Sequence, residues 1–529
     1  MTRRSYLFYP LAFAIYPVLS LYASNLAKTH LGDTVYAHLF GVALCVMVWL
    51  VSLLVTRSWE KASVGAGLGL LLFYSYNHVS VLLGINESLL RDRHLVSVCI
   101  LIFGAGLYLL RRHASSPRKL TSVLNIVGGV LIIFPLFRIA TFSVMGKGES
   151  DRLMHAAIER CTNMDTIRAT RVESRPDIYY FIVDAYSRAD VLRDVYGYDN
   201  THFIENLEKR GFVVNHEARS NYALTEQSLP SALNLTYLPI PDGIRSLKAT
   251  FPLMKRNRLF SFLKAIGYTT ITYPTAMVTD FSDADLYPGG GIEFMNEFFT
   301  MYYASTPIPS LLRGVTDFSF RRKRTDDVFR HVVTIPDMPQ PTVTFAHVST
   351  PHQPYMYGRT YHEELDSLNR TLVAMIDTIL ARSSQPPIVV IQGDHGHRKL
   401  TIADGEVSKR SLKDAMGVLN AYYLPDGGSS MMYQGVTPVN TWRLVLDYYF
   451  GANLGPLEDR VFFSWVHNEY TLTEVTDILT TTLDSTYMAD KLKIIRDLRP
   501  PGASVWKGWL TTACPTRPAD VTPVLWTNE

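Results

Sequence analysis

The first 145 residues contain five apolar stretches, each close to the length that an α-helix needs to cross a bilayer. They are expected at residues 6–26, 35–55, 62–84, 95–110 and 121–142. Because a backbone inside lipid must satisfy its own hydrogen bonds, stretches of this kind are helical there. The sequence therefore predicts an N-terminal α-helical transmembrane bundle over residues 1–145, with about five spans.

Basic residues near the ends of these stretches predict how the bundle is oriented. They fall on alternate loops, at Arg3, Arg4, Arg57, Lys61, Arg111, Arg112, Arg118 and Lys119. The intervening loops carry only Lys28, Arg91 and Arg93. Because Lys and Arg stay preferentially on the cytoplasmic side, we expect a cytoplasmic N-terminus in the inner or plasma membrane. Five spans would then export the rest of the chain to the periplasmic or extracellular side. The alternative is a cleaved signal peptide, for which residues 20–24 form a weak cleavage site.

The rest of the chain is expected to form a linker and one large domain. Residues 146–175 are polar and predict a juxtamembrane linker with a short helix, and residues 176–529 predict the catalytic domain. The formal net charge is only +3 and the basic residues are scattered, so we expect no nucleic-acid partner. Cys161 and Cys514 are the only cysteines in this part, and they could pair or remain two separate thiols.

Three apolar runs predict the core of the large domain, at residues 177–184, 342–347 and 387–394. Continuous apolar strands of this kind belong to a sheet that is covered on both faces. Helical patterns lie between them, at residues 203–209 and 361–381. The fold class is therefore a three-layer α/β domain. In open α/β sheets, polar side chains at strand ends mark the functional site.

Asp394 and His395 carry the clearest local signal for a metal site. They follow the third run, and Gly396 then allows a turn that presents both side chains from one edge. Carboxylate and neutral imidazole are good ligands for Zn²⁺ or Mn²⁺, with Ca²⁺ and Mg²⁺ as alternatives. Asp184 ends the first run and would supply another carboxylate. The competing interpretation is structural: Asp394 caps a turn, and Asp184 caps the helix that follows it.

A polar loop over residues 221–234 runs into a helical pattern and would place a hydroxyl group at a helix N-terminus, where anions also bind. Coordination to a divalent cation stabilises an alkoxide, so such a hydroxyl group could attack phosphorus or sulfur. Thr225 and Ser228 are the candidates that the loop offers.

In combination, these motifs resemble the alkaline phosphatase superfamily and its membrane-bound sulfatase-like branch of lipoteichoic-acid synthases and phosphoethanolamine transferases. The matching segments are Val183-Asp184-Ala-Tyr with Arg188, Thr225-x-x-Ser228-x-Pro230, Pro351-His-Gln-Pro-Tyr355 and Gly393-Asp-His-Gly396. The resemblance implies a sulfatase-like α/β domain, with Thr225 as the metal-bound nucleophile. It also implies that Asp184, Asp394 and His395 bind the same ion, and that histidines near Pro351 handle the substrate.

Two positions depart from the patterns of this superfamily. The transferase branch often carries glutamate where this chain has Asp184, whereas sulfatases and phosphodiesterases use aspartate. The string that begins at Ser228 mimics a sulfatase nucleophile signature, but Ala232 stands where its arginine would be. The reaction type and the preferred metal therefore stay open at this point.

Three histidines are expected to contact the substrate. His352 lies on a proline-flanked loop and could be a general acid, because imidazolium titrates near neutral pH. His347 would be a second ligand or a core residue, and His397 a substrate contact or a solvated side chain. Ser228 is a further substrate-binding candidate.

The resulting hypothesis is a transferase that works at the outer face of the membrane. It takes a phospho-head-group of the phosphoglycerol or phosphoethanolamine type from a membrane lipid through a covalent threonine intermediate. An envelope glycan or a lipid would be the acceptor. The alternatives are a sulfatase or phosphodiesterase with the same site, and a catalytically silent membrane binding protein.

Overall fold

The structure is a computed structural model, and it describes most of the chain. The described residues are 8–26, 29, 31–83, 92–112, 117–145, 167–172, 174–240, 250, 253–254, 257–273, 284–286, 288, 297–308, 317–339, 341–352, 360–402, 405–466, 468–481 and 485–499. Cys161, Cys514 and most of the predicted linker lie outside these ranges, as do residues 353–359 of the histidine loop.

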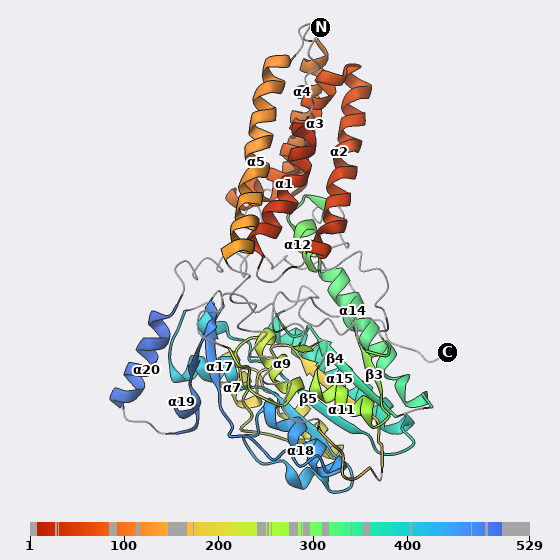
Figure 1. Ribbon diagram of the computed structural model, residues 1–529, viewed down its shortest axis with the longest axis vertical. Coiled ribbons are helices and arrows are strands. Elements are labelled where there is room, and N and C mark those ends of the chain that lie inside the picture. The colour runs from red at the N-terminus through yellow and green to blue at the C-terminus, as the bar shows by residue number, and fades with distance from the viewer. Residues whose placement is uncertain are drawn as a thin grey trace.

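An N-terminal bundle of five helices stands at one end of the long axis of the molecule (Figure 1). These helices are α1 (Tyr9–Ser24), α2 (Val35–Thr56), α3 (Trp59–Leu82), α4 (Asp92–Arg112) and α5 (Arg118–Met145), with a short 3-10 turn at Leu31–Thr34. Many large apolar side chains on α2, α4 and α5 point outward, such as Leu54, Leu101 and Phe134. Outward apolar surface of this extent is typical of a bundle in lipid.

The predicted count of five spans is corrected to about three. Only Leu31–Thr56, His94–Arg112 and Arg118–Phe142 are long and apolar enough to cross a membrane among the residues that the structure describes. Helix α1 is apolar but has only 16 residues. Helix α3 has 24 residues, but glycines along its length and Asn77 and His78 near its end dilute its apolar character.

The second part of the molecule is built on a six-stranded sheet with the order β2-β6-β5-β1-β4-β3. Its strands are β1 (Ile178–Val183), β2 (Val213–Val214), β3 (Thr269–Thr272), β4 (Thr342–Val348), β5 (Ile388–Gln392) and β6 (Asn420–Tyr423). Strands β5, β1, β4 and β3 run parallel, whereas β6 is antiparallel to β5 and β2 is antiparallel to β6. The three predicted strands are thus the three neighbouring strands β1, β4 and β5.

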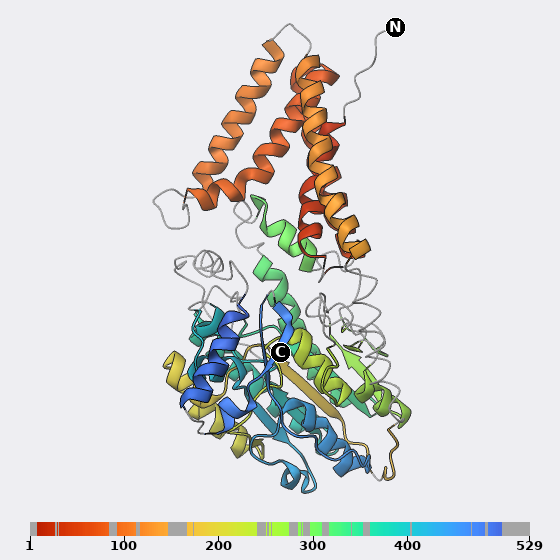
Figure 2. The ribbon, with the colours of Figure 1, turned by 60° about the vertical axis from the view of Figure 1, so that its left-hand side comes forward.

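Both faces of this sheet are buried, as the continuous apolar runs predict. Every residue of β1 is buried, and its side chains alternate between two cores. Phe181 belongs to the core that includes helix α15 (Tyr361–Arg382), and Tyr180 belongs to the core that includes α18 (Pro438–Phe450). The domain is therefore a mixed α/β sheet between two layers of helices (Figures 1 and 2).

The other elements complete these layers and extend the domain. The longer helices are α7 (Ala189–Tyr196), α8 (Thr201–Lys209), α9 (Thr225–Asn234), α11 (Arg258–Ala265), α12 (Glu297–Ala304), α14 (Asp317–Val332), α17 (Lys409–Met416) and α20 (Ser485–Asp497). The short elements are α16 (Lys399–Ile402), α19 (Thr476–Thr480), two 3-10 turns at Ile335–Asp337 and Gly428–Met431, and the antiparallel pair β7 (Phe462–Trp465) and β8 (Asn468–Glu474).

Candidate active site

The ends of three parallel strands bring the predicted ligands together. Strand β1 pairs with β4 on one side and with β5 on the other, so their carboxyl ends meet at one edge of the sheet. Asp184 follows β1, His347 lies near the end of β4, and the pair Asp394-His395 follows β5. All four side chains are buried. This edge is where open α/β sheets place their sites.

Two tight backbone turns fix the carboxylates. The residue after Asp184, Ala185, adopts a left-handed φ of 60°, and its N–H donates to Asp394 Oδ1 over 3.2 Å. Residues other than glycine rarely adopt this backbone conformation, because it costs them roughly 1–2 kcal/mol. After His395, a Cβ at Gly396 would collide with the Asp414 carbonyl oxygen. Only glycine therefore fits that turn.

Thr225 places its hydroxyl group beside Asp394 and His395. It is the first residue of α9, so a hydroxyl group lies at the N-terminus of a helix, as the loop pattern predicts. Its Oγ1 donates to Asp394 Oδ2 over 2.6 Å and lies 3.2 Å from His395 Nε2. Ser228, one turn further along α9, instead donates to the Tyr222 carbonyl oxygen over 3.0 Å. Of the two candidate hydroxyl groups, only that of Thr225 contacts the Asp394-His395 pair among the described hydrogen bonds.

The imidazole of His395 is oriented as a ligand. Its Nδ1 lies 2.8 Å from the Gly396 carbonyl oxygen, which can only accept, so Nδ1 carries the proton. The lone pair on Nε2 then faces the carboxylates of Asp184 and Asp394, each 3.5 Å away. Burial and the charge of Arg398 lower the pKa of His395, which favours the neutral form that binds metals.

Two overlapping groups of side chains could hold a metal ion, and both include Asp184. One is Asp184 with His352 and His395, and the other is Asp184 with His347 and Asp394. Within each group the potential ligand atoms all lie within 4.8 Å of one another. Asp184 Oδ1 is also buried and accepts no hydrogen bond within the described ranges. A buried carboxylate oxygen in this state fits a cation, and this observation supports the ligand interpretation.

The electrostatics of Asp184 also fit a cation site. Burial alone would raise the pKa of this carboxyl group, but the nearby histidines outweigh burial and hold its pKa well below the ordinary value. His352 contributes most among them, followed by His347, whose Nε2 lies 3.4 Å from Asp184 Oδ2. Asp184 therefore stays ionised, as a metal ligand must.

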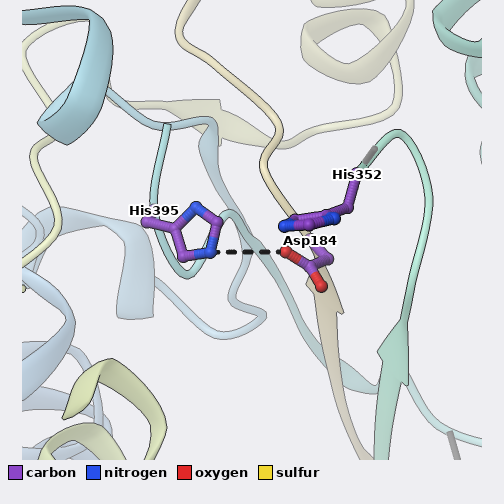
Figure 3. Close-up of side chains that lie close together, drawn as sticks. All are labelled: Asp184, His352 and His395. Atoms are coloured by element: carbon purple, nitrogen blue, oxygen red, sulfur yellow. Dashed lines mark ion pairs between the residues drawn. The ribbon is translucent and has the colours of Figure 1, made fainter. Parts of the chain in front are cut away.

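His352 and His347 both reach the cluster. Figure 3 shows His352 on the loop after β4, above Asp184 and opposite His395. The rings of His352 and His395 lie edge to face with their centroids 5.8 Å apart. His347 is buried in β4 beside Asp184, so its place in the strand does not remove it from the site.

His397 lies close to the candidate metal ligands, in a polar network of its own. Its Nδ1 is 3.1 Å from the Tyr196 hydroxyl group, which donates to Asp414 Oδ1 over 2.6 Å. Burial and the charge of His352 hold the pKa of His397 well below its ordinary value. The structure thus places this histidine close to the site but in contact with Tyr196 and Tyr361.

Arg398 is a buried charge at the site that the sequence analysis missed. Its side chain is 8% exposed, and its backbone has a left-handed φ of 64°. One guanidinium N–H donates to the carbonyl oxygen of Ala223, two residues before Thr225, over 2.7 Å. Its Nε is buried without a hydrogen-bond partner in the described part of the chain. Its position directly after His397 was the only available signal, and it does not distinguish a buried arginine from an exposed one.

Comparisons with known proteins were made at the level of families, sequences and structures. No protein-family model and no curated protein sequence matches the chain. Among solved structures, the periplasmic domain of EcEptC from Escherichia coli is 15% identical, with a TM-score of 0.39 over 59% of this chain and 97% of that one.

Two further solved structures are similar at the same level. A protein of the alkaline phosphatase superfamily from Vibrio parahaemolyticus is 12% identical, with a TM-score of 0.38 over 70% of this chain and 96% of that one. The integral membrane phosphoethanolamine transferase EptA from Neisseria meningitidis is 10% identical, with a TM-score of 0.35 over 83% and 94%. At TM-scores below 0.5, the interpretation of the site rests on its own geometry. The solved structures that the chain resembles thus include phosphoethanolamine transferases, a sulfatase and another member of the alkaline phosphatase superfamily.

Proposed function

We propose that this chain is a membrane-anchored, metal-dependent enzyme that transfers a phospho-head-group from a membrane lipid to an envelope glycan or lipid acceptor. One observation carries the proposal. The Thr225 hydroxyl group lies at the N-terminus of α9 within hydrogen-bond distance of both Asp394 and His395. A hydroxyl group so placed among potential metal ligands is a typical nucleophile.

In the proposed cycle, Thr225 gives up its proton along the hydrogen bond to Asp394, and its Oγ1 attacks phosphorus. The new O–P bond forms as the bond from phosphorus to the lipid oxygen breaks, and His352 donates a proton to that leaving oxygen. An acceptor hydroxyl group then attacks the phosphothreonine and gives its proton to His352, while the bond from phosphorus to Oγ1 breaks and Thr225 recovers its proton from Asp394. Asp184, Asp394, His395 and Thr225 would hold a divalent ion, Zn²⁺ or Mn²⁺, which supplies Lewis-acid stabilisation of negative charge.

Arg398 would help to neutralise the reacting phosphoryl group. Its charge is buried near the carboxylates of Asp184 and Asp394, and burial lowers its pKa. The hydrogen bond to the Ala223 carbonyl oxygen ties it to the loop that carries Thr225. Its unpartnered Nε–H remains able to donate to an oxyanion.

A lipid donor is supported by the way in which the two parts of the molecule meet. Helix α12 lies between the bundle and the α/β domain in both views (Figures 1 and 2). Its side chains Phe298 and Tyr302 are buried against Val18 and Ala37 of the bundle. The apolar helices would thus hold the catalytic domain at the membrane surface, with the N-terminus on the cytoplasmic side and the site outside.

The test is the intact mass of the purified full-length protein after incubation with membrane lipids. The parent is expected to gain the mass of a phospho-head-group, and Thr225→Ala is expected to gain none. Ser228→Ala is the matched control and should form the adduct like the parent, because its hydroxyl group bonds to Tyr222 instead. An identical adduct in Thr225→Ala would refute the assignment. Decay of the adduct in water alone would make the enzyme a hydrolase.

A further inference from the structure

A small pocket beside α7 and α17 is lined by four basic side chains. These are Arg188, Arg219, Lys409 and Lys413, and Gly417 and Leu479 complete its wall. The volume of the pocket is about 50 Å³. In the described part of the chain, none of the four basic side chains forms a hydrogen bond or an ion pair with Asp184 or Asp394. The pocket is therefore a separate feature that the proposed function does not use.

Among the described residues, the four basic side chains form ion pairs with only two carboxylates, Asp190 and Asp194, and Glu217 and Asp459 act on the charge of Arg219 without an ion pair. Asp190 accepts two hydrogen bonds from Arg188 and also pairs with Lys413 Nζ at 2.7 Å. Asp194, 3.6 Å from Lys413, is shared with Arg193. Among the described hydrogen bonds, Lys409 donates only to the Thr481 carbonyl oxygen. Lys409 and Lys413 also lie one turn apart on α17, where like charges repel.

Arg219 has the fewest described hydrogen-bond partners of the four basic side chains. It forms an isolated β-bridge with Gly417, which brings it to the wall of the pocket. Its Nε is buried, and no hydrogen bond to Arg219 is found among the described side chains. Leaving such a donor without a partner in the protein interior is unfavourable. A guanidinium group in this state is suited to bind an oxyanion, which accepts from its N–H groups in pairs.

We propose that this pocket binds a phosphate group, either free or at the head of a lipid, held mainly by Arg219 with Lys409 and Lys413. The Arg188–Asp190 pair forms a rigid wall of the pocket, because each guanidinium nitrogen of Arg188 already donates to the protein. The phosphate group completes the hydrogen bonding of Arg219 and supplies the ion pair that Arg219 lacks among the described residues. This inference is independent of the proposed reaction.

The experiment is calorimetric titration of the full-length protein in detergent with inorganic phosphate at constant chloride. A chelator removes metal beforehand, so that phosphate cannot bind through a metal ion. The parent is expected to bind phosphate, and Arg219→Gln is expected to bind it at least tenfold more weakly. Lys209→Gln is the matched control, because this exposed lysine on α8 also loses one charge, and it should bind like the parent.

A second variant protects the test from a folding defect in Arg219→Gln. Lys409→Gln removes only one described hydrogen bond and should weaken phosphate binding as well. Repeating the titration in phosphatidylcholine nanodiscs with and without phosphatidic acid separates the two sources. Loss of phosphate binding with phosphatidic acid indicates a lipid headgroup, and unchanged binding indicates a free anion. A parent that binds no phosphate, or folded variants that bind it as tightly as the parent, would overturn the proposal.

Discussion

Asp414 is a buried carboxyl group directly behind the turn that presents the candidate metal ligands. It accepts from the Tyr196 hydroxyl group and, over 3.0 Å, from the Leu400 N–H group. Burial raises its pKa to about 6, although the hydrogen bond from Tyr196 acts in the opposite direction. The folded protein therefore binds a proton at Asp414 more tightly than the unfolded chain does.

The raised pKa of Asp414 predicts a pH dependence of stability. An acid with a raised pKa contributes stability that is fully present below its unfolded value, near 4, and is lost as the pH rises through about 6. This contribution amounts to about 3 kcal/mol between pH 4 and pH 7. Asp414→Asn keeps the shape of the side chain without its charge, so its free energy of unfolding should fall less over that range. Denaturant unfolding at several pH values checks this, and parallel curves for parent and variant would contradict it.

Single residues could be predicted from the sequence where their chemistry and their place at a strand end agreed. Asp184, Asp394 and His395 met both conditions, and the structure brings them together. Thr225 needed the resemblance to known motifs to be chosen over Ser228. Arg398 and Asp414 could not be predicted, because their burial depends on contacts with distant segments, such as Ala223 and Tyr196.

At the level of elements, continuous apolar runs predicted the three central strands because burial on both faces removes the need for polar residues. The short strands β2, β3 and β6 were missed. Strand β2 has two residues, and β3 and β6 have four each; three of the four residues of β3 are threonine. Such segments carry too little pattern, and they become strands only because neighbouring strands offer hydrogen bonds.

Helix α12 packs against the bundle and lies between it and the α/β domain (Figures 1 and 2). Tyr302 is buried there, and its hydroxyl group lies 2.6 Å from that of Tyr74 on α3. Its ring also meets Phe40 of α2 edge to face, with the centroids 5.9 Å apart. Because these contacts join α12 to the bundle, we expect α12 to set how firmly the α/β domain is held against it.

Tyr302→Ala should therefore loosen α12 without disturbing the sheet. Removal of a buried aromatic side chain typically costs about 3–5 kcal/mol, whereas Tyr302→Phe loses only the hydroxyl contact and about 1 kcal/mol. Amide hydrogen exchange in nanodiscs checks this by mass spectrometry. Exchange of α12 should be much faster in the alanine variant and only slightly faster in the phenylalanine variant. If α12 exchanges at the same rate in Tyr302→Ala as in the parent, Tyr302 does not hold α12 against the bundle.

For the whole molecule, the sequence predicted two parts, and the structure shows a helical bundle and an α/β domain at opposite ends of the long axis (Figure 1). All five predicted stretches are helical, but α1 is too short and α3 is not apolar enough to count as a membrane span. Their burial against the other helices explains this. Ala14 of α1 and Leu70 of α3 share a core, so these helices need less lipid-facing apolar surface.

The metal content of the full-length protein tests the central claim most directly. Both candidate ligand groups include Asp184, so Asp184→Asn should remove binding whichever group holds the ion. Elemental analysis of the purified parent should find zinc or manganese at one or more ions per chain, and Asp184→Asn should retain less than about a tenth of it. Asp377→Asn, an exposed carboxylate paired with Arg210, is the matched control and should keep the parent's content. A folded Asp184→Asn protein with undiminished metal would contradict the account.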